Sequence, residues 1–138
     1  MRDKLTGHSS ERRKAPRHRV SLFGSVALVE PPYEADPPHV GPTVSAITVN
    51  ISVDGLSLIV NRSNYITKAA LSEDDRLLRV VLNLPIGESG VVELIVRIRQ
   101  PAVAAKGALR AGHQIGVQIH RMSAPHRALY NEYISTLP

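Results

Sequence analysis

Three arginines near the N-terminus have the type and spacing needed to bind an anion. Arg12 and Arg13 are adjacent, and Arg17 lies four residues after Arg13. The guanidinium group is planar, permanently charged and forked, so it can grip a phosphate through two hydrogen bonds and stack on a purine. Pro16 favours an extended chain, in which Arg13 and Arg17 project to the same side. These arginines predict a phosphate or purine contact, although arginine-rich termini are also common as solvated tails.

A second constellation, Asn-Ile-Ser-Val-Asp-Gly at residues 50–55, stands at the end of an expected strand. Asn50 and Ser52 are two residues apart and therefore share one face of an extended chain. Their short polar side chains can bind a base edge or a phosphate. Gly55 permits a positive φ or a close approach of the backbone to a ligand. The same residue types also form ordinary tight turns, so the motif alone leaves both interpretations open.

Residues that could catalyse a reaction are hard to find. The sequence has no nucleophile elbow, phosphate-binding loop, paired-histidine zinc motif or dinucleotide fingerprint. Its six histidines are scattered and cysteine is absent, so no metal site is expected. Three adjacent acids, Glu73 to Asp75, are typical of a solvated turn. We therefore expect a protein that is not an enzyme and that needs no metal or cofactor.

Charge is concentrated in an N-terminal arm. Residues 1–19 carry seven basic and two acidic side chains, which accounts for the whole net charge of +5, whereas residues 20–138 are neutral. Such an arm attracts an anionic partner. The sequence contains no apolar run of about 18 residues and no apolar core of a secretion signal, which predicts a cytoplasmic protein without membrane insertion.

The elements that must position these residues are mostly strands. Residues 1–11 lack apolar periodicity and are expected to form a disordered tail, while residues 12–138 have the size of one domain. A proline-rich loop is expected at 31–42 and a flexible connection at 102–111. Alternation of apolar and polar residues predicts six strands, over residues 20–28, 44–51, 56–60, 77–84, 91–99 and 113–120.

The last element changes to a helical period. Ser123 is a suitable N-cap and Pro125 falls in the first turn, where a missing amide is harmless. Apolar residues then recur at helical spacing up to Leu137 and form one stripe. Six short strands followed by an amphipathic helix predict an all-β fold, a small antiparallel β-barrel with a C-terminal α-helix and a flexible basic N-terminal arm.

Both motifs, in this order, resemble those of the PilZ domain family. The arginines at 12, 13 and 17 match its R-R-x-x-x-R motif, and residues 50–55 match its [D/N]-x-S-x-x-G motif. The strand at 56–58, the strand at 113–118 and the terminal helix extend the resemblance over about residues 12–135. The proline-rich loop makes the two motifs more distant than usual, and Asn50 replaces the commoner aspartate.

This resemblance implies a six-stranded barrel whose arginine segment folds over cyclic di-GMP (c-di-GMP). It implies that Arg13 and Arg17 contact phosphate and guanine, that Arg12 adds a contact, that Asn50 and Ser52 contact the guanine and backbone of the ligand, and that Gly55 leaves room. The ordered arm would then signal to a protein partner.

Two other functions remain open. A PilZ-like domain can serve as a protein adaptor that needs no ligand. A basic arm beside a small barrel also suits single-stranded nucleic acid, although one Phe, four Tyr and no Trp offer few stacking platforms and the barrel itself carries no net positive charge.

Overall fold

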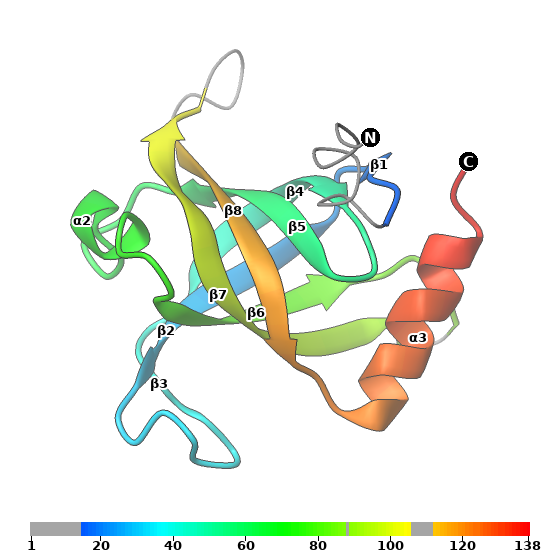
Figure 1. The fold of residues 1–138 in the computed structure, drawn as a ribbon, viewed down its shortest axis with the longest axis horizontal. Coiled ribbons are helices and arrows are strands. Elements are labelled where there is room, and N and C mark those ends of the chain that lie inside the picture. Colours follow the sequence, from blue (N-terminus) through cyan, green and yellow to red (C-terminus); the bar gives the residue numbers. More distant parts are fainter. Residues whose placement is uncertain (1–14, 88, 106–111) are drawn as a thin grey trace, which may run out of the picture.

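The computed structural model describes residues 15–87, 89–105 and 112–138. Almost every element in this part of the chain is a β-strand, and a longer helix follows the last strand (Figure 1). The elements are β1 (His18–Arg19), β2 (Phe23–Glu30), β3 (His39–Val40), β4 (Val44–Ile51), β5 (Gly55–Asn61), α2 (Lys68–Leu71), β6 (Leu77–Asn83), β7 (Val91–Ala104), β8 (Gly112–Arg121) and α3 (Ala124–Ser135).

Six of these strands close into an antiparallel barrel. The hydrogen-bonded order is β1-β4-β5-β8-β7-β6-β2-β3, and β2 also pairs with β4, which joins the two ends of the six-strand series. Phe23 lies opposite Ile47 and Val26 opposite Val44 in the closing pair. The two short strands β1 and β3 are appended to β4 and β2. The predicted six-stranded barrel with a C-terminal helix is therefore confirmed.

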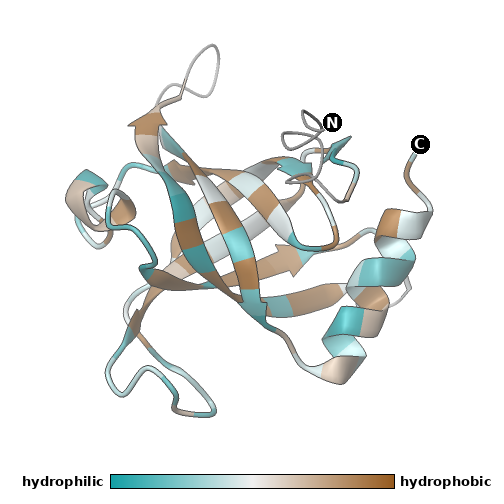
Figure 2. Ribbon diagram, in the orientation of Figure 1, coloured by the Kyte–Doolittle hydropathy of each residue, from teal (hydrophilic) through white to brown (hydrophobic). Residues whose placement is uncertain are grey.

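The barrel interior is filled by alternate residues of each strand. In β6, Leu78, Val80 and Leu82 are fully buried, whereas the residues between them are partly exposed. Figure 2 shows the same alternation as changing hydropathy along β7 and β8. Branched apolar side chains fill such a narrow barrel well, and their burial supplies the main stabilising free energy of the fold.

Strand β7 is longer than the sequence pattern predicted. It runs to Ala104, so the expectation of a flexible connection from residue 102 is wrong for residues 102–104, while most of the remainder lies outside the described residues. Val103 pairs with Gln114 and Ala104 with His113, and register shifts on either side of Gln100 accommodate the extra residues. Backbone pairing with β8 therefore overrides a composition typical of a loop.

Helix α3 lies against one end of the barrel, beside β6 and β7 (Figure 1). Its first turn is capped as predicted, because the Ser123 hydroxyl accepts a hydrogen bond from the His126 amide. Tyr130, Tyr133 and Ile134 are buried and belong to the barrel core. Within the described ranges, no helix has the length and apolar character required to cross a membrane.

Candidate ligand-binding site

Strand β1 brings the end of the arginine motif to the second motif. His18 pairs with Ile51 and Arg19 with Asn50, so the chain just before β1 must run past the end of β4. The Arg17 guanidinium donates a hydrogen bond from Nη1 to Asn50 Oδ1 at 2.8 Å. Two predicted site residues, 33 positions apart in the sequence, are thus in direct contact.

Ser52 has a different position from the one that its spacing predicted. Its side chain is buried, and the hydroxyl donates to Asp54 Oδ1 at 2.7 Å and accepts from the Gly55 amide at 3.2 Å. The Ser52 amide also donates to the Gly55 carbonyl at 2.8 Å. Ser52 therefore holds the turn between β4 and β5, and in this structure its hydroxyl is engaged within the protein.

Gly55 is required by a close approach between strands. A Cβ added at Gly55 would lie 2.7 Å from the carbonyl oxygen of Val117 on β8, closer than real side chains come to backbone atoms. Gly116, one residue earlier on β8, is similarly covered, with its added Cβ 2.6 Å from Gln100 Oε1. These two glycines let the backbone itself form the floor of a surface hollow.

This hollow, which we call the arginine hollow, has a volume of 240 Å³. Arg17 and Arg99 supply positive charge at its rim, and Asp54 supplies a negative charge. Arg99 is paired with Asp75 at 2.8 Å, whereas Arg17 has no carboxylate partner within the described part of the chain. The hollow is lined by Arg17, Asp54, Gly55, Arg99, Gln100, Gly116, Val117 and Gln118.

Helix α3 fixes the turn that borders the arginine hollow. The Tyr130 hydroxyl donates to the Ser52 carbonyl at 2.7 Å, and Arg127 Nη1 donates to the Val53 carbonyl at 2.8 Å. Burial raises the pKa of Tyr130 well above its usual value, with Asp54 adding to the rise and Arg127 opposing it. Tyr130 is therefore a neutral donor at any physiological pH, and it ties the turn to the helix.

The structure brings together some of the predicted site residues. Arg17, Asn50 and Gly55 lie at or beside the arginine hollow, and Ser52 shapes the turn behind it. Arg12 and Arg13 lie outside the described residues.

Sequence reasoning missed six of the eight residues that line the arginine hollow, including the β8 neighbours Gly116 and Val117. Asp54 was within the quoted motif and could have been included. Gln118 follows from the register that places it opposite Gly55. Arg99 and Gln100 arrive through the irregular pairing of β7 with β8, for which the sequence gives no clear signal.

Known proteins with the same fold include structures of c-di-GMP proteins. K. pneumonia MrkH, solved as a c-di-GMP complex, superposes with a TM-score of 0.62 at 18% identity, covering 90% of this chain and 51% of that one. Bacillus subtilis MotI (DgrA), described as an inhibitor of motility, gives a TM-score of 0.61 at 16% identity, covering 91% and 51%. The PilZ domain of Escherichia coli YcgR, solved with c-di-GMP, gives 0.54 at 12% identity and covers 91% of both chains.

These likenesses establish the fold, and the chain spans about half the length of the MrkH and MotI chains. A search of the curated proteins finds no match. The family model of the PilZ domain matches residues 11–136, nearly the whole sequence. The chain belongs to the PilZ domain family.

Proposed function

We propose that this chain is a non-enzymatic receptor for c-di-GMP and that the arginine hollow is its binding site. The observation that carries the proposal is the contact between Arg17 and Asn50, which unites the two motifs beside the hollow. Membership of the PilZ family supports it, as do the c-di-GMP complexes of MrkH and the YcgR PilZ domain.

The groups at the arginine hollow suit a ligand that combines phosphates with guanine. Arg17 has five N–H donors, of which one is used on Asn50, so its fork retains donors for a phosphate. The Asn50 carbonyl oxygen accepts that bond, which leaves its amide N–H groups for an acceptor on the ligand. The carboxylate of Asp54 offers acceptors for the N–H groups of a guanine edge.

The N-terminal arm would complete the site. At 240 Å³, the arginine hollow is smaller than the roughly 300–1,000 Å³ pockets that enclose small ligands. A dinucleotide would therefore protrude and leave its phosphates accessible to Arg12 and Arg13. Charge-assisted hydrogen bonds contribute about 1.5–3 kcal/mol each, so several can offset the entropy cost of ordering an arm of about ten residues.

A signal from the site would reach a protein partner through helix α3. Arg127 and Tyr130 hold two carbonyls of the turn beside the hollow, so a shift of that turn moves the hydrogen-bond partners of the helix. The ordered arm would also change the charge of the same end of the barrel. Arg127 is partly exposed, so a partner could read its shift together with the changed charge.

Isothermal titration with c-di-GMP tests the proposal, with GTP and a short oligonucleotide as control ligands. We expect saturable binding of c-di-GMP that neither GTP nor the oligonucleotide displaces. Arg17→Ala should weaken it about tenfold to a hundredfold, because it removes a charged donor from the phosphates. Arg62→Ala, which removes an exposed arginine at the other end of β5, should keep the affinity of the unaltered protein.

Two results would redirect the assignment. Unchanged affinity in an Arg13→Ala/Arg17→Ala double variant would refute the arginine site. Absence of any c-di-GMP binding would favour the ligand-independent adaptor, whereas salt-sensitive binding of the oligonucleotide alone would favour a nucleic-acid module.

A further inference from the structure

A second hollow lies at the opposite end of β5 and β8 from the arginine hollow. It has a volume of 680 Å³, within the range of small-molecule sites. Gly55 pairs with Gln118 near the arginine hollow, and Asn61 pairs with Gly112 near the second one. Six residue steps along the strand separate Gly55 from Asn61, a distance of about 20 Å. Six polar residues line the second hollow: Arg62, Ser63, Asn64, Thr67, Lys68 and His113.

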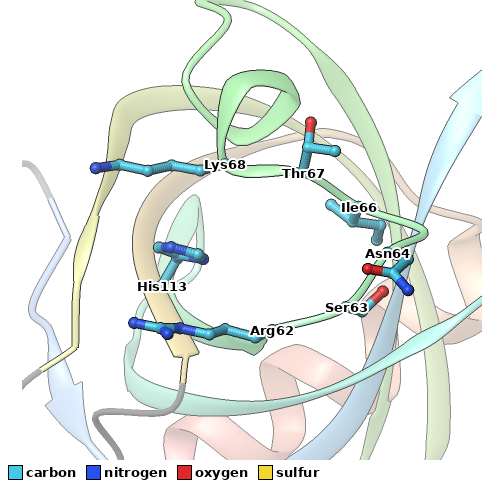
Figure 3. Close-up of a pocket in the computed structure, with 7 residues that line it drawn as sticks. All are labelled: Arg62, Ser63, Asn64, Ile66, Thr67, Lys68 and His113. Carbon is cyan, nitrogen blue, oxygen red and sulfur yellow. The ribbon is translucent and has the colours of Figure 1, made fainter.

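The local fold directs three basic side chains to this hollow. His113 stands on β8, opposite Val60, while Arg62 begins the segment that leaves β5 and Lys68 begins α2 at its end. Ile66 is 2% exposed and anchors that segment to the core. Figure 3 shows Arg62 and Lys68 on either side of His113, with the nitrogen-bearing ends of all three on the same side.

The remaining polar groups of the second hollow are also hydrogen-bond donors. The Ser63 hydroxyl accepts from the Tyr65 amide at 2.8 Å and the Thr67 hydroxyl accepts from the Ala70 amide at 3.1 Å. These bonds hold the oxygens in place and leave each O–H hydrogen available. Asn64 contributes an amide group that can donate as well.

Negative charge is missing from the lining. No carboxylate borders the second hollow, and among the described residues neither Arg62 nor Lys68 forms an ion pair. Burial lowers the pKa of His113, and the charges of Arg62 and Lys68 lower it further. Like charges that lie near one another without a counter-charge repel each other, and an anion beside them would relieve that repulsion.

We propose that the second hollow binds the phosphoryl group of a small phosphorylated molecule, held by Arg62, Lys68 and His113. The arginine offers a fork and the lysine a point charge, which match the several acceptor oxygens of a phosphate. The hydroxyls of Ser63 and Thr67, on the other side of the hollow in Figure 3, can bind the rest of the molecule. The volume leaves room for the rest of such a molecule. This site is separate from the arginine hollow and does not depend on c-di-GMP binding.

The test follows the imidazole of His113 by NMR, with its signals assigned by their loss in His113→Gln. The full chain is titrated with inorganic phosphate and, at matched ionic strength, with sodium chloride. We expect phosphate to shift the His113 signals saturably and to raise the pKa of His113, because a bound anion stabilises the imidazolium. Arg62→Ala/Lys68→Ala should weaken the phosphate effect about tenfold to a hundredfold. Arg19→Ala, a loss of one exposed arginine at the other end of the barrel, should leave it intact.

Equal shifts with phosphate and chloride would overturn the site, and so would an undiminished phosphate effect in the double variant. Ribose 5-phosphate and AMP, titrated in the same way, identify the source of the phosphoryl group. Tighter binding of either ester than of inorganic phosphate supports a phosphorylated small molecule. Weaker binding of both esters refutes that source and leaves free phosphate as the ligand. Loss of c-di-GMP binding in Arg17→Ala bears only on the arginine hollow, so the two proposals fail separately.

Discussion

The hydrogen bond from Tyr130 to the Ser52 carbonyl should be measurable through Tyr130→Phe. Tyr130 is fully buried, Ser52 is 2% exposed, and the donor and acceptor atoms are 2.7 Å apart. The substitution keeps the ring and its packing but removes the only atom that donates. It leaves a buried carbonyl without that donor, which costs about 1–3 kcal/mol. We take about 2 kcal/mol as the expected loss in the free energy of unfolding.

Urea denaturation provides the assay. For a domain of this size the free energy of unfolding falls by about 2 kcal/mol per molar urea, so the midpoint should drop by about 1 M with an unchanged slope. Tyr133→Phe is the matched control. Tyr133 is buried in the same helix, and its hydroxyl forms no hydrogen bond with the described residues. Its loss should change the free energy of unfolding by less than about 0.5 kcal/mol.

Equal midpoints for Tyr130→Phe and Tyr133→Phe would refute the reasoning. That result would mean that the turn carbonyl finds another donor and that α3 does not hold the turn through this bond. A changed slope would instead indicate an altered unfolded state, and the comparison of midpoints would then no longer measure the bond.

Two further perturbations test the packing around the site. Gly55→Ala should destabilise the barrel by about 2 kcal/mol in thermal or urea unfolding, because its Cβ would meet a backbone oxygen at 2.7 Å. Gly116→Ala should cost less, since its Cβ meets the flexible side chain of Gln100; a larger loss for Gly116→Ala would contradict this order. High pH should also destabilise the fold, because the pKa of Tyr130 is raised in the folded protein. The free energy of unfolding that un-ionised Tyr130 contributes is complete below about pH 10, the pKa of tyrosine in the unfolded chain. Above that pH it falls by up to about 1.4 kcal/mol per pH unit. Urea unfolding between pH 9 and pH 11 should therefore show a shallower decline for Tyr130→Phe than for the unaltered protein, and identical declines would contradict the assignment.

Local sequence patterns were sufficient to predict the barrel strands and the helix. The strand expected at 44–51 is observed as Val44–Ile51, because β-branched residues dominate it and a turn motif ends it. The register shift between Thr48 and Asn50, which moves burial to Ile51, was not predicted. Ser123 caps the helix as its hydroxyl and the following proline predicted. In both segments the residues that decide the structure are neighbours in the sequence.

Features that depend on distant residues were not predictable from local patterns. Barrel closure requires Val26 to pair with Val44, and the alternation of each strand is the same in an open sheet. β3 forms inside the proline-rich loop because His39 pairs with Glu30. In both cases the structure is determined by pairing with a strand that is distant in the sequence or lies across a loop.

The candidate site shows the same limit. Arg17 and Asn50 were predicted as site residues from two short motifs, and their contact follows from the pairing of β1 with β4. Ser52 shared a face with Asn50 in an extended chain, but β4 ends at Ile51 and the turn directs the hydroxyl inward. Side chains alternate between the two faces only within a strand, so the alternation does not predict the direction of the first residue after it.

Closure of the barrel also limits how the protein can associate through its strands. An unpaired strand edge offers a template for another chain, and a closed ring removes most such edges. Within the described residues, one long strand keeps a free side: beyond Ile98, β7 pairs with β8 alone. Pro101 lies in that stretch and has no amide hydrogen to offer an incoming strand. The proline thus protects the remaining edge against strand-to-strand aggregation.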